Sequence, residues 1–306
     1  MAAVRYGLTI DSSQPLPGVV DQVQRAADAG FSSATASQIF GYDALTLLAV
    51  VGQRVPGIEL ATGVVPTYPR HPIMLAAQAL TVQAAIGGRL TLGIGLSHQI
   101  VIENMFGHSF EKPARHMREY LTALGPLLRG EQVSFRGETL TAATLGPLEI
   151  DAPAPPLLVA ALGPRMLELA GTLADGTTTW MTGPATVRSH IVPHITAAAE
   201  GAGRPAPRVA VSLPVCVTDD PAAARERAAQ VFAVYGGLPS YRAMLDRERA
   251  AGPEDVAVVG DEDAVAEQIA SVAVAGATDF VGAIFGDAGE HDRTFALLAR
   301  LAKEAG

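Results

Sequence analysis

The feature that most constrains the fold of this chain is a regular alternation of short apolar runs with helix-like segments along its 306 residues. Residues 157–161 contain no polar position, and residues 90–95 and 279–284 contain only one each, which is typical of strands buried on both faces. The predicted strands are residues 4–10, 32–37, 58–64, 90–95, 157–161, 177–181, 208–217 and 279–284. The predicted helices are residues 17–29, 42–53, 71–86, 111–129, 164–174, 184–201, 220–234, 261–275 and 290–304. Gly30 and Gly276 each end a helix directly before a strand, as a glycine C-cap permits.

Eight strand-then-helix units predict an α/β fold, a closed (β/α)8 TIM barrel of parallel strands. A doubly wound open sheet is the alternative that eight such strands also allow. Two segments interrupt the alternation. Residues 131–155 are predicted to form a small β excursion with a proline-rich return, and residues 235–260 a helical insertion. We expect both to be additions to one domain spanning residues 1–306.

The net charge and the cysteine content argue against several classes of binding partner and of stabilising group. The formal net charge is −9 without a long run of like charges, which argues against nucleic acid as a partner. A single cysteine excludes a disulfide framework, and no histidine pair has metal-ligand spacing beside a third donor, so no metal is predicted. The first residues lack a signal-peptide pattern, and no apolar stretch reaches the roughly 20 residues of a membrane span. We expect a cytoplasmic protein that binds a small molecule and no membrane.

The stretch RLTLGIGLSHQ, residues 89–99, places two glycines at the end of the fourth predicted strand. In a parallel barrel the carboxyl ends of the strands carry the chemistry. Gly93 and Gly95 there would let a flat ligand approach the backbone, and Ser97 and His98 would offer hydrogen-bonding groups to the same cavity. A dinucleotide motif lacks its third glycine here, and a nucleophile elbow fails because Gln99 replaces the required glycine. A plain strand end with a polar loop also fits this stretch.

Two other strand ends carry recognisable patterns. The stretch ATGVVPTYPRHP, residues 61–72, has three prolines within seven residues, which predicts a rigid loop that serves either as a connector or as a binding wall. The stretch AALGPRMLELAG, residues 160–171, begins a helix at Pro164, so the first amides near Arg165 and Met166 would favour an anion such as phosphate. After the sixth strand comes TTTWMTGP, whose Trp180, the only tryptophan, we interpret as core.

Five blocks in order carry a family resemblance. They are TGVVPTYPRHP, GRLTLGIG, the triplet Met105-Phe106-Gly107, the segment from Arg115 to Leu121, and residues 160–176. With these blocks the chain resembles the bacterial luciferase-like monooxygenase superfamily over nearly its whole length. Within it, the chain resembles the actinobacterial branch that uses the deazaflavin coenzyme F420.

The resemblance implies where a cofactor would lie. The deazaflavin ring would occupy the barrel mouth against the third strand, where relatives have a non-prolyl cis peptide that falls here at Gly63-Val64. The cofactor phosphate would sit on the loop after the fifth strand. The implied cofactor-binding residues are Gln38, Thr62, Gly63, Val64, Gly95, Ala161, Leu162, Gly163, Pro164, Arg165, Met166 and Thr182. The family also implies a homodimer, and FMN is the alternative cofactor.

The chain departs from some relatives at two places. Several deazaflavin-dependent relatives have an Asp-His pair at the end of the second strand, where this chain has Ser37-Gln38-Ile39. Sugar-phosphate dehydrogenases of the family have a glutamate after the fourth strand, near the position of His98. These departures argue against a sugar-phosphate substrate. Gln38 can hydrogen-bond a ring edge but cannot transfer protons near neutral pH.

The resulting hypothesis is an oxidoreductase that transfers a hydride between F420 and a small organic substrate. His98 and Ser97 are the predicted catalytic residues: His98 for proton exchange, with an ordinary pKa near 6.5, and Ser97 for positioning. A structural histidine bonded to its loop is the alternative for His98.

The rival functions are an FMN-dependent monooxygenase using molecular oxygen and a non-catalytic ligand-binding barrel. We expect the substrate pocket between the segments 99–112 and 235–260, and the other histidines at the surface or on helices: His108, His116, His190, His194 and His291.

Overall fold

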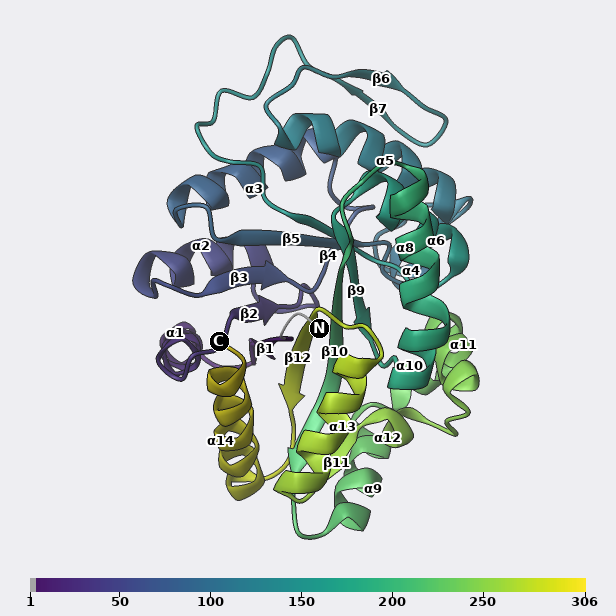
Figure 1. Cartoon of the computed structure of the whole chain (residues 1–306). Coiled ribbons are helices and arrows are strands. Elements are labelled where there is room, and N and C mark those ends of the chain that lie inside the picture. Colours follow the sequence, from purple (N-terminus) through teal and green to yellow (C-terminus); the bar gives the residue numbers. More distant parts are fainter. Residues whose placement is uncertain (1–3) are drawn as a thin grey trace.

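The computed structural model describes residues 4–306, and eight parallel strands form its centre (Figure 1). Each strand pairs with the next along the chain, and the last pairs with the first, so the sheet closes on itself. The strands are β1 (Arg5–Thr9), β2 (Ser33–Ala36), β3 (Glu59–Thr62), β5 (Leu90–Gly95), β8 (Leu157–Ala160), β9 (Gly176–Trp180), β10 (Arg208–Val217) and β12 (Asp279–Ile284). The predicted TIM barrel is confirmed, and the open sheet is excluded by this closure.

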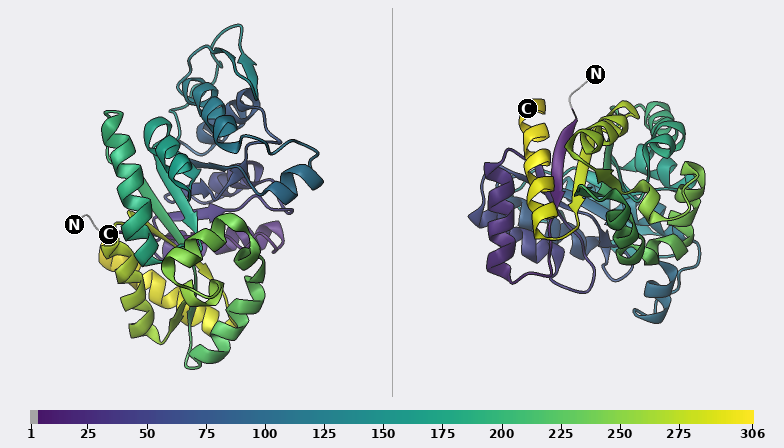
Figure 2. Two further views of the ribbon diagram at one scale, coloured as in Figure 1. Left: turned by 90° about the vertical axis from the view of Figure 1, so that its right-hand side faces the viewer. Right: turned by 90° about the horizontal axis from the view of Figure 1, so that it is seen from below.

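Helices surround the barrel, as the view from below in Figure 2 shows. They are α1 (Leu16–Asp28), α2 (Ala44–Arg54), α3 (Pro72–Ala85), α5 (Pro113–Leu128), α6 (Pro164–Leu173), α7 (Pro184–Thr186) continuing as the π-helix η1 (Val187–Ile191) and α8 (Val192–Gly201), α9 (Pro221–Val231), α13 (Glu262–Val274) and α14 (Ala288–Ala305). Aspartates cap several of them, for example Asp43 on α2 and Asp261 on α13. Gly30 and Gly276 have φ of +87° and +105°, which confirms the predicted glycine helix ends.

The additional segments are α4 (Gln99–Asn104), β4 (Val65–Pro66), β6 (Ser134–Arg136), β7 (Thr141–Ala143), α10 (Ala233–Gly237), α11 (Pro239–Glu248), α12 (Pro253–Val256) and β11 (Val258–Gly260). The predicted β excursion is an antiparallel hairpin, β6–β7, which lies outside α3 and α5 (Figure 1). The predicted insertion is helical except at its end, where β11 pairs in parallel with β10. The prediction was wrong at β11, and it also missed α4.

Strand register determines which side chains point into the barrel. Thr9 pairs with Thr35, and Ala160 pairs with Thr178, at the carboxyl ends of their strands. Thr9, Ala160 and Thr178 are half-buried, whereas their outward-facing neighbours, such as Leu8, are buried against the helices. The inward positions at this end are therefore small and still open to solvent. Within residues 4–306, none of the helices is both long and apolar enough to cross a membrane.

Candidate active site

The mouth of the barrel at the carboxyl ends of the strands is bounded on one side by a bulge after β3. The peptide bond Gly63-Val64 is cis, as the family resemblance implied. The Ser37 hydroxyl donates to the Gly63 carbonyl at 2.8 Å, and the Thr62 hydroxyl both donates to and accepts from the backbone of Gly93 at 2.8 Å. These bonds tie the bulge to both neighbouring strands, β2 and β5.

The structure corrects the interpretation of the two glycines in β5. A Cβ atom on Gly93 would lie 2.0 Å from the carbonyl oxygen of Thr62, and one on Gly95 would lie 2.7 Å from Cγ2 of Val64. The prediction that a ligand fills the space above them is wrong, because the β3 bulge fills it. Gly95 is buried, whereas Gly63 and Val64 of the bulge are half-buried and remain accessible.

The start of α6 has the properties predicted for an anion site. Gly163 caps the helix without a side-chain hydrogen bond, and the first helical backbone bond runs from Leu167 N to Gly163 O at 3.0 Å. Within residues 4–306 the amides of Arg165 and Met166 have no acceptor. A Cβ on Gly163 would meet no atom within 4 Å, so the space beside these amides is open. Free amides, a nearby guanidinium and open space fit the phosphate of a deazaflavin or flavin cofactor.

A histidine that the sequence analysis did not single out supports this loop. His190, on η1, is buried, and its Nε2 lies 2.8 Å from the carbonyl oxygen of Leu162. A carbonyl oxygen only accepts, so Nε2 carries the hydrogen and donates it. The bond fixes the chain just before Gly163. Its sequence context, VRSHIVPH, contains no motif that predicts this role.

The predicted catalytic pair lies at the end of β5. Ser97 has φ of +60°, a left-handed conformation that few residues other than glycine adopt. His98 follows at the start of α4; it is half-buried, and its ring centre is 5.6 Å from that of Tyr241. Its ring nitrogens have no hydrogen-bond partner in the described chain, so no bond to its own loop holds it. Burial lowers the pKa of His98, which makes its imidazole neutral at pH 7.

The remaining predicted cofactor residues differ in accessibility. The Gln38 carbonyl oxygen accepts from the Ala44 amide at 2.8 Å and from Arg70 at 3.3 Å, so its side-chain N–H groups remain for a ring edge. Thr182 is fully buried, and its hydroxyl donates to the Trp180 carbonyl at 3.2 Å. Protein atoms cover four of the predicted contact residues: Thr62, Gly95, Ala161 and Thr182. The accessible ones are Gln38, Gly63, Val64, Leu162, Gly163, Pro164, Arg165 and Met166.

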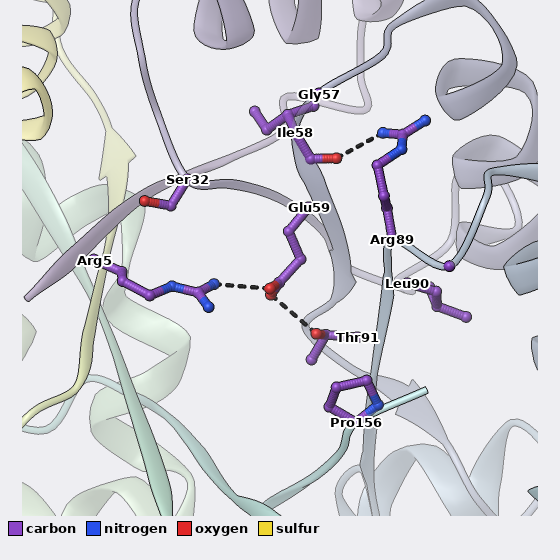
Figure 3. Close-up of a pocket in the computed structure, with 10 residues that line it drawn as sticks. Arg5, Ser32, Gly57, Ile58, Glu59, Arg89, Leu90, Thr91 and Pro156 are labelled. Atoms are coloured by element: carbon purple, nitrogen blue, oxygen red, sulfur yellow. Dashed lines mark hydrogen bonds and ion pairs between the residues drawn. The ribbon is translucent and has the colours of Figure 1, made fainter. Parts of the chain in front are cut away.

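The opposite end of the barrel holds a cavity of 460 Å³ lined by Arg5, Glu59, Arg89 and Thr91, among others (Figure 3). Its polar groups are largely bonded to one another. Arg5 Nη2 donates to Glu59 at 2.8 Å, and the Arg89 guanidinium donates to three carbonyl oxygens at 2.6 to 2.9 Å. This cavity lies at the amino ends of the strands, the face that contributes stability in TIM barrels.

Comparisons with known proteins agree with this geometry. A Mycobacterium tuberculosis protein named as a coenzyme F420-dependent oxidoreductase is 32% identical over 194 residues, which cover 57% of this chain and 55% of that protein. The chain thus spans about half the length of that relative. The solved structure of the coenzyme F420-dependent tetrahydromethanopterin reductase from Methanopyrus kandleri superimposes with a TM-score of 0.82 at 22% identity, covering 98% of both chains.

A flavin enzyme has the same fold. The oxygenating constituent of 3,6-diketocamphane monooxygenase from Pseudomonas putida, solved with FMN, has a TM-score of 0.75 at 19% identity over 99% of this chain and 98% of that one. The profile of the luciferase-like monooxygenases matches residues 1–279. This chain therefore belongs to the luciferase-like monooxygenase family.

Proposed function

We propose that this chain is an oxidoreductase that transfers a hydride between the deazaflavin coenzyme F420 and a small organic substrate. The observation that carries the proposal is the start of α6, where the free amides of Arg165 and Met166 and the exposed Arg165 side chain adjoin open space. A phosphate group there would receive amide hydrogen bonds and the favourable end of the helix dipole. The relative named as an F420-dependent oxidoreductase supports the choice of cofactor.

When bound, the cofactor would supply the two-electron chemistry. The protein would hold it at two places: Val64 behind the ring, and the loop from Leu162 to Met166 at the anionic linkage. His190 keeps that loop in position through its bond to the Leu162 carbonyl.

His98 is the residue we assign to proton exchange. In the oxidation of an alcohol, the neutral imidazole of His98 would accept the hydroxyl proton, and the bound cofactor would supply the acceptor for the hydride that leaves the carbon. In the reduction of a ketone, the imidazolium of His98 would return a proton to the carbonyl oxygen, and the reduced cofactor would supply the hydride. The pKa of His98, lowered by burial, keeps the imidazole free to accept a proton at pH 7. We assign Ser97, its neighbour, to positioning the substrate oxygen.

A second candidate is an FMN-dependent monooxygenase that uses molecular oxygen. The structural similarity to an FMN-containing monooxygenase favours it. The phosphate of FMN carries the same chemistry as the linkage in F420, so the start of α6 suits either cofactor.

Separate titrations with F420 and with FMN, followed by cofactor fluorescence, test the proposal. We expect F420 to bind at least about tenfold more tightly, a difference of roughly 1.4 kcal/mol. Arg165→Ala should raise the F420 Kd about threefold to tenfold, as removal of an exposed charge-assisted contact does. The matched control is Arg54→Ala, which removes an exposed arginine at the far end of α2.

Tight binding of FMN alone, with oxygen-dependent turnover, would replace the proposal with the second candidate. Binding of neither cofactor would reject both and leave a ligand-binding barrel.

A further inference from the structure

Four aromatic side chains lie beside the mouth, and one of them, Trp180, has a buried Nε1 without a hydrogen bond of good geometry in the described chain. They are His98 after β5, Trp180 at the end of β9, Tyr235 in α10 and Tyr241 in α11. We infer that this aromatic row binds the substrate, and that the substrate is a neutral molecule with a planar unsaturated or aromatic body and an oxygen acceptor such as a ketone. The inference rests on the proposed function, since it assigns the substrate class of the same mouth.

The rings form one continuous row. The ring centres of His98 and Tyr241 are 5.6 Å apart, those of Tyr241 and Tyr235 are 5.2 Å apart, and those of Tyr235 and Trp180 are 5.7 Å apart. The two contacts of Tyr235 are edge-to-face, at 88° and 76°, a favoured geometry for aromatic pairs. Phe232 also packs edge-to-face on Trp180, with the ring centres 5.9 Å apart.

Hydrogen bonds to the helical insertion, residues 235–260, fix the position of the two tyrosines of the row. The Glu248 carboxylate at the end of α11 accepts hydrogen bonds from the amides of Ala185 at 3.0 Å and Thr186 at 2.7 Å, on the helix that follows β9. Trp180 pairs with Ser212 on β10 and lies two residues after Thr178, whose side chain faces inward. Because side chains alternate between the two faces of a strand, Trp180 also points toward the barrel interior. β8 lies between β5 and β9, so the row from His98 to Trp180 spans the end of β8.

The side chains of the row offer hydrogen-bond donors to a ligand. Trp180 Nε1, which can only donate, is buried without an acceptor of good geometry in the described chain. The Tyr235 hydroxyl lies close enough to Trp180 for the indole N–H to lower the pKa of Tyr235, which burial raises, through a hydrogen bond, but the geometry of that bond is too poor to satisfy Nε1. Burial raises the pKa of both Tyr235 and Tyr241, so these hydroxyls stay protonated and able to donate. A buried donor such as Trp180 Nε1 is nearly always paired in native proteins, and here an acceptor on a ligand would complete it, with the half-buried tyrosine hydroxyls as further donors.

The chemistry of the row indicates a neutral ligand. None of its members is charged at pH 7: the tyrosines are protonated, and burial keeps His98 neutral. The carboxylate of Glu248, which lies close by in sequence, is occupied by two backbone amides. A charged ligand would lose its hydration without gaining a counter-charge, whereas a planar neutral body gains ring contacts.

The test compares three probes with the whole protein: acetophenone, a neutral aromatic ketone; benzoate, which has the same ring and a charge; and cyclohexyl methyl ketone, which has the carbonyl without a planar ring. Saturation-transfer NMR titrations give each Kd. We expect acetophenone to bind at least about tenfold more tightly than the other two. Tyr241→Phe, which keeps the ring, and Trp180→Phe, which keeps an aromatic side chain but removes the indole N–H, should each raise its Kd about threefold to tenfold, as loss of one hydrogen bond does. Tyr6→Phe, at the opposite end of the barrel, is the matched control and should leave the Kd unchanged.

Equal binding of acetophenone and benzoate would overturn the inference, as would wild-type affinity in both row variants. An F420 titration of the same samples separates the two proposals. Normal F420 binding without acetophenone binding rejects the inference and leaves the proposed function. Acetophenone binding that depends on Trp180 but is accompanied by no F420 binding supports the row as a site and rejects the proposed function.

Discussion

The two ends of the barrel differ in how their polar groups are paired. At the amino end, Arg5 and Arg208 bond every carboxylate oxygen of Glu59 and Asp279 with help from two threonines. At the carboxyl end, the amides of Arg165 and Met166 have no acceptor in the described chain, and the buried Nε1 of Trp180 has none of good geometry. Paired polar groups stabilise the fold, whereas unpaired ones are free to bind a ligand. The cavity of 460 Å³ lies at the paired end, so the presence of a cavity does not by itself mark the site.

Disrupting the ion pairs at the amino end of the barrel should have the largest effect on the free energy of unfolding. Burial disfavours the charge of Arg208, but its hydrogen bonds and the charges of Asp279 and Glu59 raise its pKa overall. Arg208→Met leaves two carboxylates in the barrel without this partner and should lower the free energy of unfolding by about 3–5 kcal/mol. Urea unfolding followed by tryptophan fluorescence measures it. The control Arg300→Met removes an exposed pair with Glu304 and should cost less than about 0.5 kcal/mol. A loss below about 1 kcal/mol for Arg208→Met would contradict the comparison.

A buried histidine near the carboxyl end predicts a pH dependence of stability. His116, on α5, has its Nε2 3.1 Å from the Thr67 hydroxyl and stacks on Tyr68 at 4.0 Å. Burial lowers the pKa of His116 from 6.5 to about 4. The unfolded chain therefore binds more protons in this interval, so stability is fully present above pH 6.5 and falls as the pH drops toward 4. The loss amounts to about 3 kcal/mol.

Unfolding titrations of wild type and His116→Gln between pH 7 and pH 4 check this dependence. The variant should show a shallower fall of stability with decreasing pH. Identical slopes would show that His116 does not take up a proton on unfolding in this range.

Two glycine substitutions contrast a filled space with an open one. Gly93→Ala places a methyl group against the Thr62 carbonyl and should destabilise the fold by about 1–3 kcal/mol, as overpacking does. Gly163→Ala meets no protein atom and should leave stability within about 0.5 kcal/mol, while its methyl group weakens cofactor binding about fivefold or more. Thermal unfolding and F420 titration of both variants measure the contrast. The reverse pattern would place the ligand at β5 instead of α6.

The smallest effect concerns Ser97, which adopts φ of +60° beside the predicted reacting centre. Ser97→Gly removes the steric strain of this conformation, but it also raises the conformational entropy of the unfolded chain. The free energy of unfolding should therefore change by less than about 1 kcal/mol. If Ser97 positions the substrate, turnover falls although stability does not. Unchanged turnover, measured under the same conditions, would remove Ser97 from the site.

The fold could be predicted from the sequence because its signals are local. Apolar runs of strand length alternate with helix patterns, and glycines such as Gly30 and Gly276 mark helix ends. The short β11 was missed because three apolar residues inside a helical insertion carry no period of their own. The start of α6 was located correctly because a Gly-Pro pair before an amphipathic pattern specifies a helix terminus.

The site was harder to predict where it depends on contacts between distant segments. Gly93 and Gly95 were assigned to a ligand, because a sequence does not show whether the space beside a glycine holds a ligand or a neighbouring strand. Trp180 was interpreted as core, since its unpaired Nε1 is visible only when α10 and α11 are placed beside β9. The bond from His190 to the Leu162 carbonyl likewise joins residues 28 positions apart.

The most direct test of the central claim follows the backbone amide resonances during an F420 titration by heteronuclear NMR. The account predicts that the amides of Arg165 and Met166 shift downfield as they bond to the cofactor phosphate, while those of Arg89 and Thr91 at the amino end stay in place. Shifts confined to the amino end, or bound cofactor with both α6 amides unmoved, would contradict it.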